Sequence, residues 1–166
     1  MKKMIFAAAI VLVLFSCKKS SGPGNIVAIN TISATVDGKS YVFNTRPDFY
    51  TGIDTTESYF DGSAEDSATS YLDVYFQTLG KPLTTGTYLS GTGDSLYNAY
   101  LEFDSSGGND YYGSTLKVSD APITIKVTTF DGNQVQGTFQ GTVYENNDTT
   151  ESSVVITNGK FNGTRQ

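Results

Sequence analysis

Apolar and polar residues alternate in short stretches along most of the chain, a pattern typical of strands with one buried face. In the first stretch, Ile32, Ala34 and Val36 alternate with polar residues and are followed by Asp37-Gly38. Because Asp-Gly favours a two-residue type I′ turn, residues 32–43 are predicted to form a β-hairpin. That loop pairs Val36 with Lys39, Ala34 with Tyr41 and Ile32 with Phe43, and so places the apolar residues on one face.

A second hairpin is predicted from the alternation over residues 123–129 and 135–143, on either side of Asp131-Gly132-Asn133. A two-residue loop would mix the two faces, so we expect a three-residue loop with Asn133 in the left-handed conformation. This loop sets Val127 opposite Gly137 and Ile125 opposite Phe139. Gly137 and Gly141 then lie on the inner face, where they indicate close contact with a large neighbour.

The remaining pattern predicts further strands. Alternation indicates strands over residues 71–77, 97–103, 111–118 and 154–161, and short strands near 57–61 and 87–89. The apolar residues of the first two strands point into the core, so Tyr71, Tyr75 and Tyr100 point outward. Residues 45–69 carry the weakest pattern.

These elements predict an all-β fold with about nine antiparallel strands in one domain, residues 27–166. The mixture of long and short connections favours a β-sandwich. The series of sequential hairpins also fits an up-and-down, calycin-like barrel, which stays open as the alternative.

The chain begins with a secretory signal pattern: Lys2 and Lys3, then the apolar run Met4–Phe15. As a helix, these 12 residues would reach about 18 Å, well short of the roughly 30 Å hydrocarbon core of a bilayer. We therefore expect a signal helix within residues 1–16 that is removed, and not a membrane span.

The four residues Leu14-Phe15-Ser16-Cys17 resemble the bacterial lipobox. The resemblance implies cleavage before Cys17, a diacylglyceryl thioether on its sulfur and an acylated new N-terminus, with palmitate as a typical chain. Two or three acyl chains anchor a protein stably, whereas one does so only marginally. Residues 17–26 would then form the lipidated start and a flexible tether that holds the domain close to the membrane.

The charge balance limits the partners. The chain has 11 basic and 17 acidic residues, and loss of the signal lowers the net charge from −6 to −8. An acidic domain is repelled by nucleic acid, which we exclude as a partner, and by anionic headgroups, so the membrane contact is expected through the acyl chains on Cys17.

The absence of histidine and the single cysteine narrow the chemistry. Ser-His and Cys-His catalysis is excluded, and zinc and haem lose their usual ligands, so we expect no catalytic residue, no metal and no cofactor. A pair of carboxylates acting on a glycan stays open. Residues 104–110 and 145–148 offer oxygen ligands for calcium, but solvated hairpin loops explain their composition.

The outward tyrosines are candidate binding residues. Tyr71, Tyr75 and Tyr100 could stack on sugar rings. The alternative is cross-strand packing, or cover by a second sheet.

Three segments resemble small Bacteroidota lipoproteins of unknown role: Ile32–Lys39, Gly86-Thr87-Tyr88 and Ile156–Phe161. The resemblance implies an all-β domain without catalytic residues. Lys18-Lys19 departs from the acidic residues that follow the lipidated cysteine in surface-exposed members, which implies the outer membrane with the domain facing the periplasm. The phylum's O-glycosylation signal is matched at Thr55, Ser67, Ser95 and Thr149.

The sequence therefore predicts a lipid-anchored, non-enzymatic cell-envelope domain that binds or supports an envelope protein or glycan. Two alternatives stay open: a calycin-like carrier of a small apolar ligand, and a carbohydrate-binding or glycan-acting protein.

Overall fold

The structure is a computed structural model that describes residues 27–53, 57–90, 99–105, 110–114 and 123–165. The expected signal and tether, residues 1–26, lie outside this part. Eleven strands are described: β1 (Thr31–Val36), β2 (Lys39–Phe43), β3 (Thr45–Ile53), β4 (Glu57–Glu65), β5 (Tyr71–Leu79), β6 (Gly86–Leu89), β7 (Ala99–Asp104), β8 (Tyr111–Gly113), β9 (Thr124–Phe130), β10 (Gln134–Glu145) and β11 (Ser153–Thr164). None of the described residues forms a helix long and apolar enough to cross a membrane.

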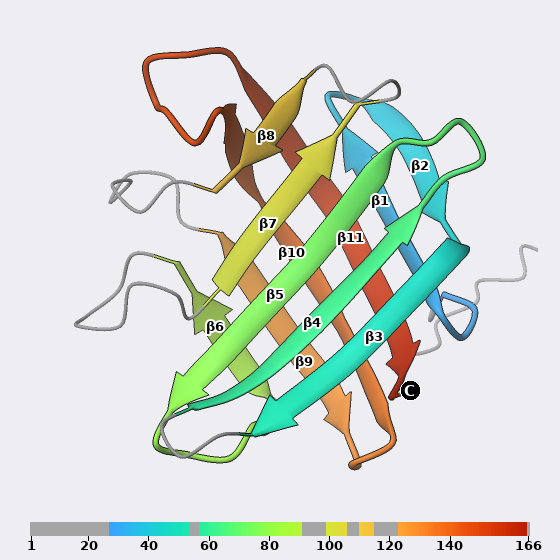
Figure 1. The fold of residues 1–166 in the computed structure, drawn as a ribbon, viewed down its shortest axis with the longest axis vertical. Helices are drawn as coiled ribbons and strands as arrows, with labels where there is room; N and C mark the ends of the chain where they lie inside the picture. Colours follow the sequence, from blue (N-terminus) through green and yellow to red (C-terminus); the bar gives the residue numbers. More distant parts are fainter. Residues whose placement is uncertain (1–26, 54–56, 91–98, 106–109, 115–122, 166) are drawn as a thin grey trace, which may run out of the picture.

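The strands form one antiparallel sheet in the order β2-β1-β11-β10-β8-β7-β5-β4-β3 (Figure 1). Strand β10 has two partners on the side away from β11. Its first part pairs with β9, which in turn pairs with β6, and its last residues pair with β8. The sheet curls until its ends β2 and β3, joined by Asn44 alone, meet at a seam. There the Asn44 amide donates to the Glu65 carbonyl across 3.0 Å.

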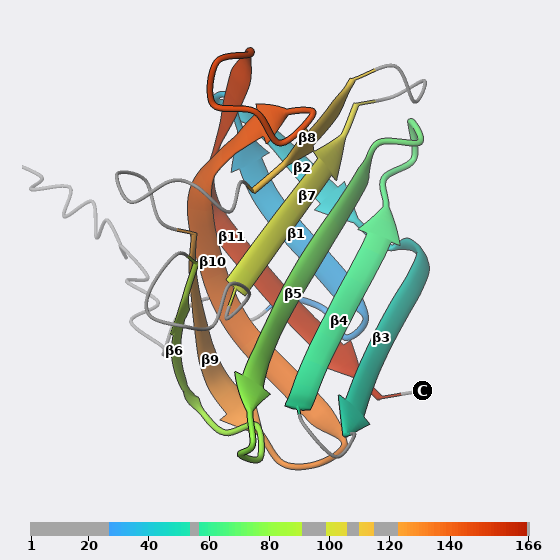
Figure 2. The ribbon, with the colours of Figure 1, turned by 60° about the vertical axis from the view of Figure 1, so that its left-hand side comes forward.

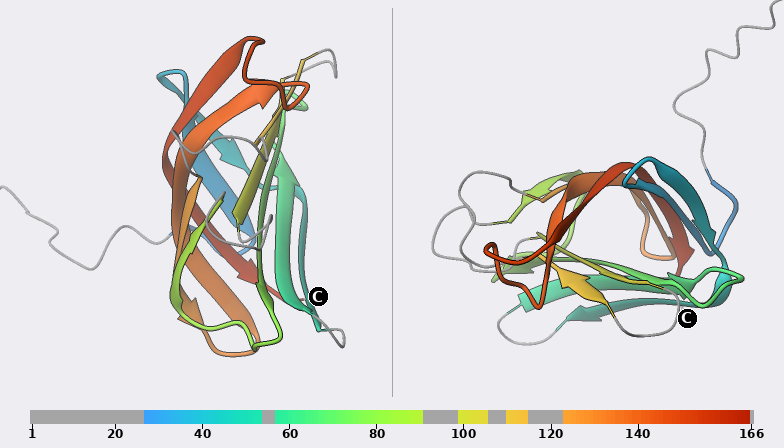
Figure 3. Two further views of the ribbon diagram at one scale, coloured as in Figure 1. Left: turned by 90° about the vertical axis from the view of Figure 1, so that its left-hand side faces the viewer. Right: turned by 90° about the horizontal axis from the view of Figure 1, so that it is seen from above.

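The all-β antiparallel fold is confirmed. The sheet is continuous and nearly closed into a barrel, so the structure has the alternative arrangement and not the two separate sheets of a sandwich. Strands β3, β4, β5 and β7 form one wall, and β1, β10 and β11 form the opposite wall (Figures 2 and 3). Inner and outer residues alternate along the strands of a sandwich and of a barrel alike, so only the pairing of the strands distinguishes the two architectures.

The first predicted hairpin is confirmed residue by residue. Strands β1 and β2 pair Val36 with Lys39, Ala34 with Tyr41 and Ile32 with Phe43. Asp37 and Gly38 have φ of 46° and 81°, as a type I′ turn requires.

The second hairpin has the predicted pairs with a different turn. Strands β9 and β10 pair Val127 with Gly137 and Ile125 with Phe139, but a bulge separates these pairs from Phe130–Val135. The expectation of a left-handed Asn133 is wrong, because Gly132 takes the positive φ of 88°. The Asp131 carboxylate accepts the amides of Asn133 and Gln134 at 3.0 and 2.8 Å and so fixes the turn.

The weak pattern of residues 45–69 hides two long strands. Strand β4 extends well beyond the short strand expected near 57–61, and β3 was not expected at all. A register shift between Thr45 and Asp48, with Arg46 at φ 47° and Pro47 beside it, interrupts the alternation that would reveal β3.

Aromatic rings pack around Phe161 of β11 in the interior. Its ring centroid lies 5.4 Å from that of Phe60, 6.2 Å from Phe76 and 6.4 Å from Phe139. Gly137 makes room for this ring, because a Cβ there would lie 2.5 Å from a Phe161 ring carbon. The glycine on the inner face thus faces the large neighbour that the sequence predicted.

We predict that Phe161→Ala lowers the free energy of unfolding by about 3–5 kcal/mol, because it removes the ring that joins the two walls. Urea denaturation measures the change. Val155→Ala serves as the control, since Val155 lies on the same strand but is 47% exposed, and we expect about 0.5 kcal/mol or less there. Equal losses in both variants would contradict the central place of Phe161.

Candidate functional site

The outer surface of β3, β4, β5, β7 and β8 gathers tyrosines and acids, and we call it the tyrosine–acid face. On β5, Leu72, Val74 and Phe76 are buried in the core, so the residues between them point outward. The face comprises Asp48, Tyr50, Tyr59, Asp61, Tyr71, Asp73, Tyr75, Tyr100, Glu102, Asp104 and Tyr111.

Strand register decides which of these side chains meet. Tyr75 of β5 lies directly opposite Tyr100 of β7 and opposite Asp61 of β4. One row along, Asp73 lies directly opposite Glu102. Side chains opposite each other on one face have Cβ atoms about 4.5–5.5 Å apart, so these residues interact.

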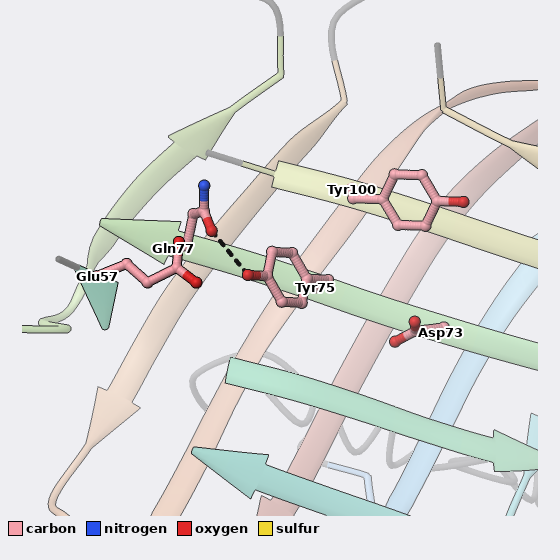
Figure 4. A pocket seen from close by; sticks show the side chains of 5 residues that line it. All are labelled: Glu57, Asp73, Tyr75, Gln77 and Tyr100. Atoms are coloured by element: carbon pink, nitrogen blue, oxygen red, sulfur yellow. Dashed lines mark hydrogen bonds between the residues drawn. The ribbon is translucent and has the colours of Figure 1, made fainter. Parts of the chain in front are cut away.

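Part of the face is hollowed to about 480 Å³, lined by Glu57, Asp73, Tyr75, Gln77 and Tyr100 (Figure 4). The hollow is open to solvent. The Tyr75 hydroxyl donates to Gln77 Oε1 at 2.7 Å, which fixes the ring and directs the Gln77 amide group. Two aromatic rings and several polar groups therefore line one concave surface.

The three tyrosines predicted as a stacking surface do not all join this hollow. Tyr75 and Tyr100 line it, whereas Tyr71 lies on the same face opposite Asp104. The alternative of cross-strand packing also holds in part: the Tyr75 ring stacks on Tyr59 at 5.9 Å, and Tyr59 contacts Tyr50 at 5.8 Å. All three predicted tyrosines are half-buried.

Tyr100 is held by a hydroxyl network. Its hydroxyl lies 2.6 Å from that of Tyr111, and Glu102 Oε2 lies 3.2 and 3.4 Å from the two, so three hydrogen-bond contacts share two phenol protons. The pKa of Tyr100 is raised mainly by burial, and further by the hydrogen bond to Tyr111 and the charge of Glu102. Burial, and next the charge of Asp73, raises the pKa of Tyr71 to about 12. Both phenols thus stay neutral hydrogen-bonding groups.

Three carboxyl groups crowd beside the rings: Asp61, Asp73 and Glu102. Burial first, and then the charges of Asp61 and Glu102, raises the pKa of Asp73 well above its ordinary value. Burial also raises the pKa of Asp61 and of Glu102. Asp61 and Asp73 share a hydrogen bond, which requires a proton on one of them. Deeper burial disfavours the charged form of Asp73, so the proton lies on that carboxyl group.

No cation within the described residues forms a salt bridge with these three carboxyl groups. The salt bridge of this face joins Arg46 and Glu65 at 3.3 Å, with Arg46 largely exposed. Asp73 Oδ1 is buried and has no hydrogen-bond partner in the described part of the chain. A buried acceptor without a donor is costly and indicates a place where a ligand can bind.

The other predicted site residues lie elsewhere. Cys17, Thr55 and Ser95 fall outside the described residues. Ser67 and Thr149 lie in exposed turns, as expected. The Asp66 carboxylate before Ser67 accepts the amides of Ala68 and Ser70 at 2.9 and 2.8 Å, so the motif at Ser67 also stabilises its turn.

Of the two segments considered for calcium, residues 106–109 of the first lie outside the described residues. Across the described ranges, no group of three or more acidic or other ligating side chains is placed to hold a metal ion. The Asp148 carboxylate accepts the amide and hydroxyl of Thr150, both at 2.9 Å, as a hairpin-loop aspartate does.

Sequence reasoning missed much of the site. Alternation on β5 places Asp73 and Gln77 beside Tyr75, so these two could have been found. Asp61, Glu102 and Glu57 come from other strands, and only the register brings them near.

Comparisons with protein-family models, with curated proteins and with solved structures give no match. The functional argument therefore depends on the geometry of the site.

We predict that stability decreases as the pH rises above 3.8, the ordinary value for Asp73. Between that value and the raised pKa, the folded protein keeps a proton that the unfolded chain has lost. Its contribution is therefore complete below this window and is lost as the pH rises through it. Asp73→Asn should reduce this slope in urea denaturation, since the Asn amide donates to Asp61 without titrating.

The control for this slope is Glu151→Gln, an exposed position that does not line the hollow. Its slope should match that of the unmodified protein. An unchanged slope in Asp73→Asn would mean that Asp73 holds no proton in the folded state.

Proposed function

We propose that this protein is a lipid-anchored cell-envelope lipoprotein whose barrel binds a glycan on the tyrosine–acid face, without catalysis. One observation carries the proposal: Tyr75 and Tyr100 lie opposite each other and line a hollow with Asp73, Gln77 and Glu57. Aromatic rings stack on the apolar faces of sugars, and carboxylate and amide groups bind sugar hydroxyls.

The packing of aromatic rings between the two walls favours the outer face over the carrier alternative. Tyr88 and Phe76 lie 4.6 Å apart, and Phe76 and Phe60 4.9 Å apart, between the two walls. These rings occupy the described interior, where a calycin-like carrier would hold a small apolar ligand.

The anchor is supported by the lipobox-like residues Leu14-Phe15-Ser16-Cys17. Acyl chains on Cys17 would hold the barrel at the outer membrane, facing the periplasm, within reach of envelope glycans. Nucleic acid is an unfavourable partner for so acidic a surface. Glycosylation at Thr55, Ser67, Ser95 and Thr149 remains a prediction.

We predict that the mature protein, purified in detergent, binds members of an oligosaccharide panel measured by calorimetry. Tyr75→Ala should weaken that binding about ten-fold, because it removes a stacking ring. Tyr75→Phe should weaken it less, since the ring remains and only the hydroxyl bond to Gln77 is lost. Val42→Ala, 55% exposed on β2, is the control and should change nothing. Binding that Tyr75→Ala leaves intact would refute this site.

We predict that mass spectrometry of the membrane-extracted protein finds an N-terminal peptide beginning at Cys17 and carrying acyl chains. The protein should require detergent for extraction. An unmodified N-terminal peptide, or a protein that is soluble without detergent, would refute the anchor.

A glycan-acting enzyme is the second candidate, and the pair Asp73–Glu102 favours it. Directly opposite residues have Cβ atoms about 4.5–5.5 Å apart, so both carboxyl groups lie on one side of the sheet, as the acid and the nucleophile of a glycosidase must. The protonated Asp73 could act as the acid. New reducing ends from a bound oligosaccharide, lost in both Asp73→Asn and Glu102→Gln, would establish hydrolysis and replace the binding proposal.

A further inference from the structure

The charge of the tyrosine–acid face restricts the kind of glycan that fits it. Asp61, Asp73 and Glu102 raise one another's energy, as their neighbouring positions and coulombic interactions show. Like charges directly opposite each other destabilise a sheet. Because no described cation pairs with these groups, a cationic ligand would relieve their repulsion, whereas a neutral sugar would leave it in place.

The Asp73 oxygen that lacks a hydrogen-bond donor restricts the ligand more closely than the net charge of the face does. Asp73 lines the hollow, and Figure 4 shows its side chain beside Tyr75 and Tyr100. Its buried Oδ1 lacks a donor among the described residues. Because Asp73 lines the hollow, a ligand that enters between the rings lies next to this carboxyl group.

An ammonium group has the required properties. It donates up to three hydrogen bonds, and its positive charge favours release of the Asp73 proton to solvent, so that the ligand binds the carboxylate. Within about 6 Å of a tyrosine ring it also gains cation–π attraction, and Tyr75 and Tyr100 supply two such rings. A metal ion fits less well, because the described residues include no group of three or more ligating side chains with the geometry to hold one.

We infer that the glycan carries an unacetylated amino sugar whose ammonium group binds Asp73 between Tyr75 and Tyr100. This inference rests on the proposed function and names its ligand class. An N-acetyl group has no charge and a bulkier substituent at the same nitrogen, so the site should discriminate between the two forms.

The test compares a glucosamine trisaccharide, its N-acetylated form and a neutral glucose trisaccharide by calorimetry. The mature lipoprotein is used in detergent, at mildly acidic pH and physiological salt, where the amine is protonated and distant charges are screened. We expect the glucosamine trisaccharide to bind about ten-fold or more tightly than the other two, as a charge-assisted hydrogen bond in a partly buried site allows.

Two variants assign that preference to the hollow. Asp73→Asn keeps the shape and the donor to Asp61 and should abolish the preference. Glu151→Gln removes one charge from an exposed position that does not line the hollow and should retain it. If both variants lose the preference equally, or if Asp73→Asn keeps it, the assignment to Asp73 is overturned.

The remaining outcomes separate this inference from the proposed function. Equal affinity for all three trisaccharides, reduced by Tyr75→Ala, would overturn the amino-sugar inference and leave glycan binding supported. No binding of these sugars or of the wider oligosaccharide panel would overturn both.

Discussion

The contact of Phe161 with rings from the opposite wall holds the barrel in shape. Phe161 comes from β11, whereas Phe60 and Phe76 come from β4 and β5, so these contacts join strands that share no hydrogen bonds. Gly137 on β10 makes room for the ring. With the inner side chains fixed by packing, the alternate side chains on the same strands are fixed on the outside. The geometry of the tyrosine–acid face therefore depends on the aromatic core beneath it.

That face departs from what stability alone favours. Asp73 and Glu102 lie directly opposite each other, and Asp73 has a buried oxygen without a donor. A sheet selected only for stability would pair opposite charges or replace these acids. Departures of this kind concentrate at sites that bind or react, where the rest of the fold tolerates their cost. The hydroxyl bonds from Tyr100 and Tyr111 to Glu102 offset part of it.

Local signals predicted the local structure well and the site only in part. Asp37-Gly38 determined the first hairpin, since a two-residue turn leaves one register. The outward positions of Tyr75 and Tyr100 followed from alternation, but their pairing did not, because nothing in the sequence joins β5 to β7. The position of Asp61 beside Tyr75 could not be predicted for the same reason. Strand β3 was missed because the irregular backbone at Arg46 interrupts the alternation of its residues.

The sequence by itself determined most of the strands with their inner and outer faces, the Asp37-Gly38 turn and the signal pattern at the N-terminus, because each depends on residues close together in the chain. Tertiary structure alone decided that one sheet curls into a barrel, that Tyr75 faces Tyr100, and that three acids gather beside them. These contacts join residues far apart in sequence, and strand pairing follows from the packing of the whole core, which no short segment encodes.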